Sequence, residues 1–333
     1  MVSISRIKDL GKEFPSGVIV NEIVGEDSNG QRIDNFLIKR LKGVPKSHVY
    51  QLLRSGQVRL NSKRVDAAHR LQLGDTVRIP PVRIAENNAP FKKKITAARL
   101  IPFEILFQDE TLLVINKPAG VAVHGGSGVS FGVIEQLRTQ HPDWRFLELV
   151  HRLDRGTSGV LLLAKSRVAL LELHRQIRAG LMEKRYLTLV KGKWHNPRQS
   201  VKLSLNKYLT AVGERRVAVT TDAKDGMQAH TVFTLKKSWQ HFSLLEAELK
   251  TGRTHQIRVH LAHLGFPIAG DDKYGDFTLN RELARSSREP GLGRMFLHAF
   301  VAQLTHPVTG KSLRLEAPLA KDLEEFLSGL DRE

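Results

Sequence analysis

The feature that most constrains the fold of this chain is the apolar run Val160–Ala164, which predicts a strand of the hydrophobic core. The segment before it places Asp154 close to two arginines, and Gly156 and Gly159 leave the backbone free to approach a ligand closely. The pattern therefore predicts a carboxylate in a basic turn that a buried strand holds rigidly. On spacing alone, a surface turn with a solvated ion pair is the simpler interpretation, and a catalytic carboxylate is the alternative.

Length and charge limit the class of protein. With 333 residues, the chain exceeds the usual size of one hydrophobic core, so we expect two domains or one large domain with an appendage. It carries 52 Lys or Arg against 34 Asp or Glu, a formal net charge of +18. Residues 1–94 hold half of that excess, with 18 basic and 9 acidic residues. Such a charge predicts a polyanionic partner, which leaves RNA, DNA and anionic membrane open.

Other features exclude several kinds of chemistry and location. The chain has no cysteine, so it forms no disulfide, zinc–thiolate site or thiol nucleophile. No stretch approaches the roughly 20 apolar residues of a membrane span, and the N-terminus lacks an apolar signal core. We therefore expect a cytoplasmic protein that does not bind membranes. The histidines near the motifs have no companion carboxylates at metal-ligand spacing, so no metal site is expected.

The first part of the chain predicts a compact basic module. Apolar residues at helical spacing predict a helix over residues 33–41, and a second helix begins at Val44–Ser47 and ends at Gly56. Residues 58–65 predict a small hairpin that turns at Asn61-Ser62, and residues 74–80 predict a closing strand.

From Ile105 onward, the pattern changes to alternating strands and short helices. Residues 112–124 predict a strand, a proline–glycine turn and a second strand. Further strands are expected over 185–190 and 242–249. After the turn Thr251–Arg253, a helix capped by Thr254 is expected to stop at Gly265.

The order helix, helix, basic hairpin resembles the S4 RNA-binding domain. The resemblance implies that one basic surface faces the phosphates of folded RNA, giving affinity with little base readout. The residues expected on that surface are Lys46, Arg54, Arg59, Lys63 and Arg64. A solvated basic face without a ligand is the alternative.

Three separated segments resemble the motifs of the RluA-type pseudouridine synthase family. They are His151–Asp154, Lys184–Val190 and Gly252–His260. The match extends to residues 116–120, 270–275 and 297–299. It implies an α+β fold in which a catalytic domain with a largely antiparallel mixed sheet follows a small S4-like domain.

These resemblances divide the chain into four parts. Residues 1–29 form an N-terminal extension, 30–82 an S4-like domain, 83–104 a linker and 105–333 the catalytic domain.

The resemblance implies roles for three residues. Asp154 is the nucleophile or base at the junction of ribose and uracil, and its carboxyl is ionised at neutral pH without tuning. Arg258 holds that carboxylate ionised and aimed, with a planar guanidinium able to clamp it through two hydrogen bonds. Tyr186 stacks on the extruded uracil or removes the proton at C5, although taken alone it fits a core position. The isomerisation needs no cofactor or metal.

Two arginines beside Asp154 are further candidates for RNA binding. Arg152 resembles the residue that fills the stack vacated by a flipped base, and a simple phosphate contact is its alternative role. Arg155, next to Asp154, is expected to contact RNA as well.

Several functions fit these motifs. The principal interpretation is isomerisation of specific uridines in large-subunit ribosomal RNA by a monomeric enzyme. A transfer RNA pseudouridine synthase shares the motifs, and a catalytically silent RNA-binding ribosome-assembly protein would share the charge distribution. A DNA glycosylase also acts on a flipped nucleotide, but it would release the base.

Overall fold

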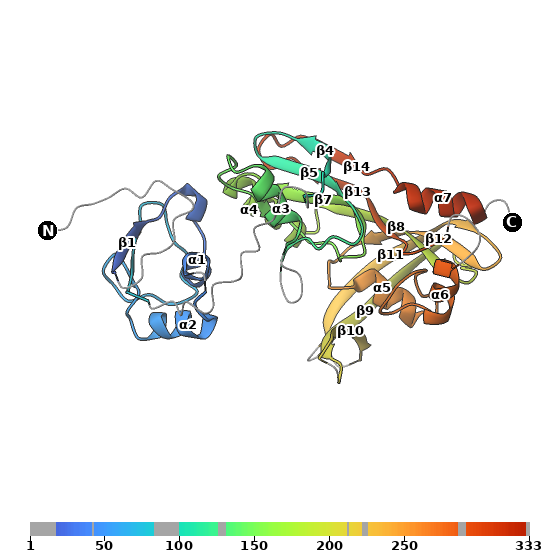
Figure 1. Ribbon diagram of the computed structural model, residues 1–333, viewed down its shortest axis with the longest axis horizontal. Helices are drawn as coiled ribbons and strands as arrows, with labels where there is room; N and C mark the ends of the chain where they lie inside the picture. The colour runs from blue at the N-terminus through green and yellow to red at the C-terminus, as the bar shows by residue number, and fades with distance from the viewer. Residues whose placement is uncertain are drawn as a thin grey trace. The chain divides into compact units, whose positions relative to one another are not determined.

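The computed structural model describes residues 18–41, 43–82, 100–125, 131–211, 213–221, 226–285 and 291–330. The chain forms two compact units, Met1–Leu100 and Ile101–Glu333, which we call the N-terminal unit and the C-terminal unit (Figure 1). Residues 1–17 of the expected extension and residues 83–99 of the expected linker lie outside the described residues.

The N-terminal unit packs two helices against one face of a three-stranded sheet. Its elements are β1 (Val20–Ile23), the 3-10 helix η1 (Glu26–Ser28), α1 (Ile33–Arg40), α2 (Lys46–Arg54), β2 (Arg59–Leu60) and β3 (Thr76–Ile79). The strand order is β1-β3-β2, and both pairings are antiparallel. Val77 and Ile79 are buried against Phe36, Leu37 and Leu53 of the helices. Because side chains alternate along a strand, the polar residues of β3 lie on the opposite, open face.

The two expected helices and the closing strand of this unit are confirmed, but the expected hairpin has only one regular strand. Asn61 and Ser62 both adopt positive φ, 47° and 68°, which is the backbone of a tight hairpin turn. The second arm is reduced to a single bridge between Leu60 and Lys63, since β2 pairs instead with β3.

The C-terminal unit is built on one long sheet, to which eleven of the strands in the described residues belong (Figure 1). The strands are β4 (Glu104–Gln108), β5 (Leu112–Lys117), β6 (Glu148–Leu149), β7 (Ser158–Ala164), β8 (Glu183–Lys191), β9 (Arg198–Leu209), β10 (Arg215–Thr220), β11 (Met227–Ser238), β12 (Phe242–Leu249), β13 (Leu297–Thr305) and β14 (Ser312–Glu316). The main path runs β10-β9-β11-β12-β8-β13-β7-β5-β4. Only the pairing of β13 with β7 is parallel among the described strands, so the expected α+β fold with a largely antiparallel sheet is confirmed.

In the described part of this unit, five helices cover the two faces of the sheet: α3 (Val133–Gln140), α4 (Arg167–Arg178), α5 (Gln256–His263), α6 (Phe277–Arg285) and α7 (Lys321–Leu330). Strand β7 is buried along its whole length, as its apolar sequence predicted. Its residues Leu161 and Leu163 face a core shared with α3, α5 and α7. Val160 and Leu162 face the other core, which α4 covers.

Strand β13 joins two parts of the sheet. On one side it pairs with β8, which leads to β12, β11, β9 and β10, and on the other side with β7, which leads to β5 and β4. Asp154 precedes β7 and Arg258 follows β12, so the two candidate residues come from different parts.

One predicted strand does not form. Residues 121–124 were expected to be a strand, but they are irregular in the structure. The carbonyl of Val121 accepts a hydrogen bond from Lys117, while those of Ala122 and Val123 accept from Val133 and Ile134 at the start of α3. This segment therefore satisfies the free N–H groups of a helix end rather than those of a neighbouring strand.

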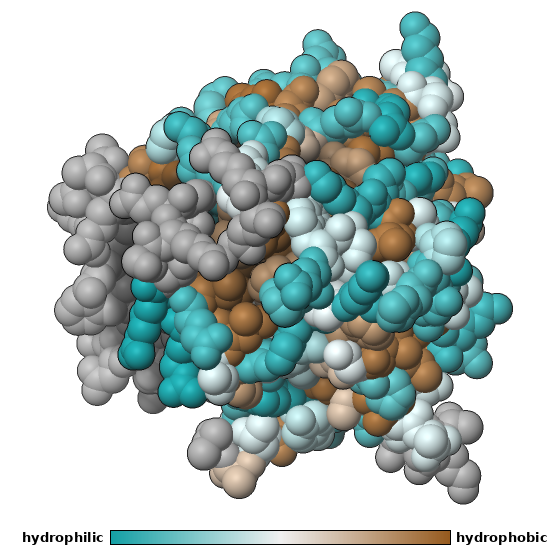
Figure 2. All heavy atoms as spheres, turned by 90° about the vertical axis from the view of Figure 1, so that its right-hand side faces the viewer, coloured by the Kyte–Doolittle hydropathy of each residue, from teal (hydrophilic) through white to brown (hydrophobic). Residues whose placement is uncertain are grey.

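The surface of the C-terminal unit is mixed in character. Figure 2 shows hydrophilic residues over much of one face, with smaller hydrophobic patches between them. In the parts of the chain that the structure describes, no helix has the length and apolar character needed to cross a membrane.

Candidate active site

The loop that carries Asp154 is tied to the turn that follows β5. The N–H of Gly120 donates to the carbonyl of Arg155 at 2.8 Å, and Nε of Arg155 donates back to the carbonyl of Gly120 at 2.8 Å. Within the loop, the N–H of Thr157 donates to the carbonyl of Asp154 at 3.1 Å. The Asp154 side chain, 19% exposed, therefore projects from a braced backbone.

Lys117, at the end of β5, is the buried support of this loop. Its ammonium donates to the carbonyls of Pro118 (2.9 Å), Val121 (2.8 Å) and Arg155 (3.3 Å). Burial lowers the pKa of Lys117 to about 7, although the negative charge of Asp154 opposes the shift. The sequence drew attention to residues 116–120 only through the family motif and predicted no role for this lysine.

Gly159 serves packing rather than ligand access, contrary to the expectation from sequence. It has φ +107°, and a Cβ there would lie 2.1 Å from the carbonyl oxygen of Ala299 on β13. Gly156 faces the side chain of Met295 at an ordinary contact distance. Glycine at 159 thus allows β7 and β13 to pair at the base of the Asp154 loop.

Arg258 on α5 is the centre of the site, and its contacts differ from the expectation in one respect. Its bidentate clamp holds Asp271, through Nε to Oδ2 at 2.7 Å and Nη2 to Oδ1 at 2.6 Å. Asp154 receives a single hydrogen bond, from Nη1 to Oδ2 at 3.2 Å. Nη2 also donates to exposed Asp272 at 3.1 Å. One guanidinium therefore contacts three carboxylates, and its two hydrogen bonds to buried Asp271 orient it toward Asp154.

Asp271 has no exposed surface and is held as a carboxylate. Burial alone would raise its pKa, but the hydrogen bonds and charge of Arg258 and the N–H groups of Lys273 and Tyr274 bring the pKa below its ordinary value. Burial alone would lower the pKa of Arg258, but the hydrogen bonds and charges of Asp271 and Asp154 raise that pKa above its ordinary value. Both charges are therefore kept in the buried pair.

His255 contributes a second nitrogen near Asp154. Its Nε2 lies 3.8 Å from Oδ2 of Asp154, and its Nδ1 lies 2.8 Å from the hydroxyl of Tyr274. That hydroxyl also accepts from the N–H of Val217 at 2.9 Å, which fixes its position beside the imidazole. Burial lowers the pKa of His255, although the charge of Asp154 opposes the shift. His255 therefore places an imidazole nitrogen beside the carboxylate of Asp154.

The predicted helix cap at Thr254 is wrong. The N-cap is His255, in the left-handed region with φ 53° and ψ 23°. The preceding turn is closed by Gln256, whose Oε1 accepts from the N–H of Arg253 at 2.9 Å and the hydroxyl of Thr251 at 2.8 Å. A non-glycine residue in this backbone region costs about 1–3 kcal/mol, and such outliers gather at functional sites.

Tyr186 on β8 is buried, 7% exposed, among the residues of the core shared with α3, α5 and α7. Its neighbours across the sheet are Ala247 on β12 and Ala299 on β13. Burial raises the pKa of its phenol, and the charge of Asp154 raises that pKa further. The phenol is therefore protonated at neutral pH.

The structure brings Asp154 and Arg258 together, and the charge of Asp154 acts on the phenol of Tyr186. Of the seven RNA-binding candidates, two lie in the Asp154 loop and five in the N-terminal unit. Arg152 and Arg155 are exposed beside Asp154, with Nε of Arg155 engaged by Gly120. The other five are exposed in the N-terminal unit: Lys46 and Arg54 on α2, Arg59 on β2, and Lys63 and Arg64 after the turn.

Sequence reasoning missed Lys117, His255, Tyr274 and Asp271 as parts of the site. For Asp271 there was a signal, since a buried arginine needs a carboxylate and the pair Asp271-Asp272 lies in a quoted motif.

Comparison with known proteins shows which families the chain is similar to. Residues 111–263 match the family model described as RNA pseudouridylate synthase, and residues 31–77 match the S4 domain. Ribosomal large subunit pseudouridine synthase C of Escherichia coli K12 is 49% identical over 322 residues, covering 96% of this chain and 98% of the relative. The protein of the same name from Pasteurella multocida is 49% identical over 308 residues, or 92% of each chain.

A solved structure also matches. The human protein RNA Pseudouridylate Synthase Domain Containing 4 gives a TM-score of 0.54 at 25% identity, covering 68% of this chain and 93% of that one.

Proposed function

The chain belongs to the RNA pseudouridylate synthase family, and on that premise we propose that it isomerises specific uridines of large-subunit ribosomal RNA to pseudouridine. The observation that carries this proposal is the Asp154 carboxylate held by buried Arg258, in a chain whose relatives at 49% identity are named ribosomal large subunit pseudouridine synthase C.

Asp154 starts the reaction at the junction of ribose and uracil, as nucleophile or base. The bond from C1′ to N1 breaks, the uracil turns, and C5 joins C1′. N1 gains a proton and C5 loses one, so the product has the mass of the substrate and no redox partner or nucleotide fuel enters the balance. Because the two hydrogen bonds to buried Asp271 fix Arg258, the guanidinium meets the carboxylate in one orientation, which lowers the cost of aligning it for reaction.

Tyr186 supports the flipped base. Its raised pKa keeps the phenol protonated, which makes it a poor base for the C5 proton at pH 7. We therefore assign its ring to stacking against uracil, a role that needs no change of protonation.

The exposed arginines of the Asp154 loop act on the RNA around the target. A uridine in a stacked helix cannot reach Asp154, so the nucleotide must be extruded. Arg152 fills the space left in the stack or binds the adjacent phosphate, and Arg155 offers its terminal nitrogens to RNA while Nε holds Gly120. The five basic residues of the N-terminal unit give affinity and register on a large structured RNA. The enzyme acts as a monomer in the cytoplasm, where such RNA is assembled.

The decisive test is release of tritium from large-subunit ribosomal RNA labelled at uridine C5. We expect release by the wild-type chain and none by Asp154→Ala, with RNA binding preserved in the variant. No release by the wild type on free or assembling ribosomal RNA would overturn the proposed substrate. Release from labelled transfer RNA would then identify a transfer RNA synthase, and no release from either RNA would leave a silent binding protein.

A further inference from the structure

The open face of the sheet in the N-terminal unit carries two arginines that face each other across strands. Arg59 on β2 is the direct register partner of Arg78 on β3, and Asn21 on β1 is the partner of Arg78 on the other side. The three residues therefore form one row across the sheet, on the face opposite α1 and α2. The sequence predicted Arg59 as part of one basic surface with α2 and did not single out Arg78.

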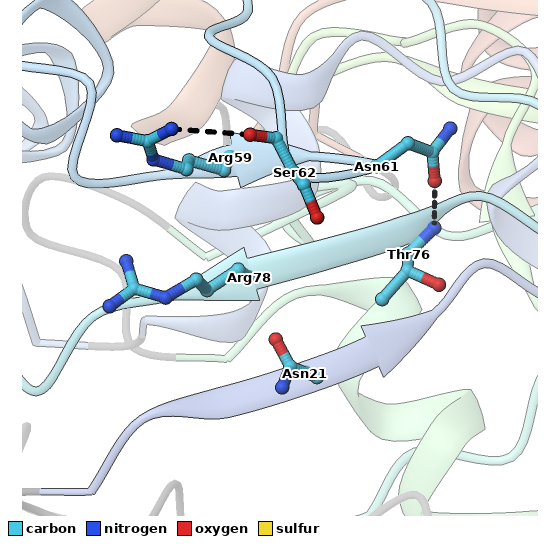
Figure 3. Close-up of a pocket in the computed structure, with 6 residues that line it drawn as sticks. All are labelled: Asn21, Arg59, Asn61, Ser62, Thr76 and Arg78. Atoms are coloured by element: carbon cyan, nitrogen blue, oxygen red, sulfur yellow. Dashed lines mark hydrogen bonds between the residues drawn. The ribbon is translucent and has the colours of Figure 1, made fainter.

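This row borders a hollow of about 500 Å³, lined by Asn21, Arg59, Asn61, Ser62, Thr76 and Arg78. Figure 3 shows the two guanidinium groups at the same end of the hollow, with the Ser62 side chain directed between their strands. Nη1 of Arg59 donates to the carbonyl of Ser62 at 3.2 Å, and Nη1 of Arg78 donates to the carbonyl of Gln57 at 3.0 Å. These bonds fix both side chains and leave their other nitrogens available.

No carboxylate balances the pair. Neither arginine forms an ion pair with any residue that the structure describes, and the lining contains no acidic residue. The nearby Asp75 is occupied by the Asn61 amide and the N–H of Gln72. Like charges directly opposite on a sheet repel each other, so an anion between them gains from both charges at once.

We propose that this hollow is a phosphate-binding site for the backbone of the RNA substrate, distinct from the basic surface of α2. The proposal rests on the proposed function for the identity of the RNA. Guanidinium forks match the oxygens of a phosphodiester, and Ser62 and Asn21 add hydrogen-bonding groups. The lining has no aromatic ring on which a base would stack, so the site holds the backbone and reads no sequence.

The test compares matched arginines in the full chain. Arg59→Ala and Arg78→Ala each remove one cation of the site. Arg70→Ala is the control, because Arg70 is also exposed and also donates Nη1 to a backbone carbonyl, that of Gly30 at 2.9 Å, but does not line the hollow. Affinity for a transcript of large-subunit ribosomal RNA is measured at several salt concentrations, with a circular dichroism spectrum of each variant. Arg59 is more exposed than Arg78, so Arg59→Ala tests the site even where Arg78→Ala disturbs folding.

We expect each site variant to bind roughly ten-fold more weakly than Arg70→Ala, the loss typical of a charge-assisted contact. The double variant should also reduce the slope of log K against log salt by about one, as one phosphate contact is lost. Arg78→Lys should recover part of the affinity, since it restores the charge without the fork. Site variants that bind like Arg70→Ala, with an unchanged salt slope, would refute the site.

Tritium release by the wild-type chain is scored separately. Release without any effect of the site variants overturns this inference alone. Weakened binding by the site variants without release from the wild type supports the phosphate site and overturns the proposed function alone.

Discussion

Arginine appears in this molecule in two opposite settings. Arg258 has a side chain only 5% exposed and contacts three carboxylates. Arg59 and Arg78 line an open hollow, face each other, and contact no carboxylate of the described residues. The buried guanidinium is neutralised by the protein and orients another group. The exposed pair is left without compensation by the protein, so its charge is available to an external anion. The number of carboxylates around an arginine thus separates an orienting role from a binding role.

The largest effect is expected from Arg258→Lys, which replaces the buried guanidinium by an ammonium. An ammonium keeps the charge but cannot hold Asp271 through two bonds while also reaching Asp154. We expect kcat to fall on the order of 10²-fold, because Asp154 is no longer held in one orientation. We also expect a loss of about 3 kcal/mol in stability, because a buried pair is broken. Tritium release and calorimetry measure the two effects.

Asp272→Asn is the matched control, since exposed Asp272 contacts the same guanidinium. It should leave the melting temperature unchanged. Equal losses in the two variants would contradict the assignment of orientation to the buried clamp.

Lys117→Met tests a buried cation whose partners are carbonyls rather than carboxylates. The three carbonyls of Pro118, Val121 and Arg155 lose their donor, and the loop of Asp154 loses its support. We expect a cost of about 2 kcal/mol and a fall in kcat larger than any change in KM. The same substitution at exposed Lys193 should change neither quantity. A wild-type kcat in Lys117→Met would show that the loop holds its geometry without this brace.

His260→Leu replaces a buried polar side chain that has no hydrogen-bond partner in the described structure. His260 lies two residues after Arg258, has no exposed surface, and neither ring nitrogen has a hydrogen-bond partner in the described structure. Burial, with the charges of His263 and His230, lowers its pKa from the ordinary 6.5 to about 4. As pH falls from 6.5 to 4, the unfolded chain takes up a proton at this residue and the folded chain does not, so stability is lost over that window.

A leucine at position 260 takes up no proton, so the His260→Leu variant does not lose stability from this residue as the pH falls. We expect the stability of His260→Leu relative to wild type to grow by about 2 kcal/mol between pH 7 and pH 4.5. Urea titrations at several pH values measure it, with exposed His195→Leu in the same unit as the control. Parallel pH profiles for His260→Leu and wild type would rule out a buried neutral imidazole.

The smallest expected effect comes from the exposed pair itself. Arg59→Thr relieves the repulsion with Arg78 and places a good strand former on β2. The melting temperature of the N-terminal unit should rise by about 1–3 °C at low salt, and the rise should be smaller at high salt because the repulsion is screened. A fall in melting temperature at low salt would mean that the protein itself compensates the pair.

Elements whose signal is local were predictable from the sequence. The strand β7 followed from five consecutive apolar residues, β12 has the predicted bounds Phe242–Leu249, and the Asn61-Ser62 turn lies at the predicted position. In each case, neighbouring residues alone favour the structure.

Features that depend on distant partners were not predictable. Thr254 has the side chain of a helix cap, but the structure places His255 at the cap. The Gln256 amide closes the turn before the helix, and it is anchored to Thr231 and the carbonyl of His230 on β11. The clamp of Arg258 on Asp271 likewise depends on a turn that only the folded chain brings to α5. The motifs predicted that Asp154 and Arg258 share one site. That the guanidinium of Arg258 donates to three carboxylates could be seen only in the structure. The catalytic and RNA-binding roles themselves stay predictions for the experiments above.

The position of β13 has a consequence for the order in which the protein acquires its abilities. Asp154 and Arg258 are 104 residues apart in the chain, and the strand that joins their two parts of the sheet begins only at Leu297. A ribosome that adds about 5–20 residues per second makes that strand many seconds after Asp154 has been made. The N-terminal unit, by contrast, has all its described elements within residues 20–79 and can fold from them early. During its own synthesis, the chain therefore presents its arginine-lined hollow well before the carboxylate and guanidinium of the active site can meet.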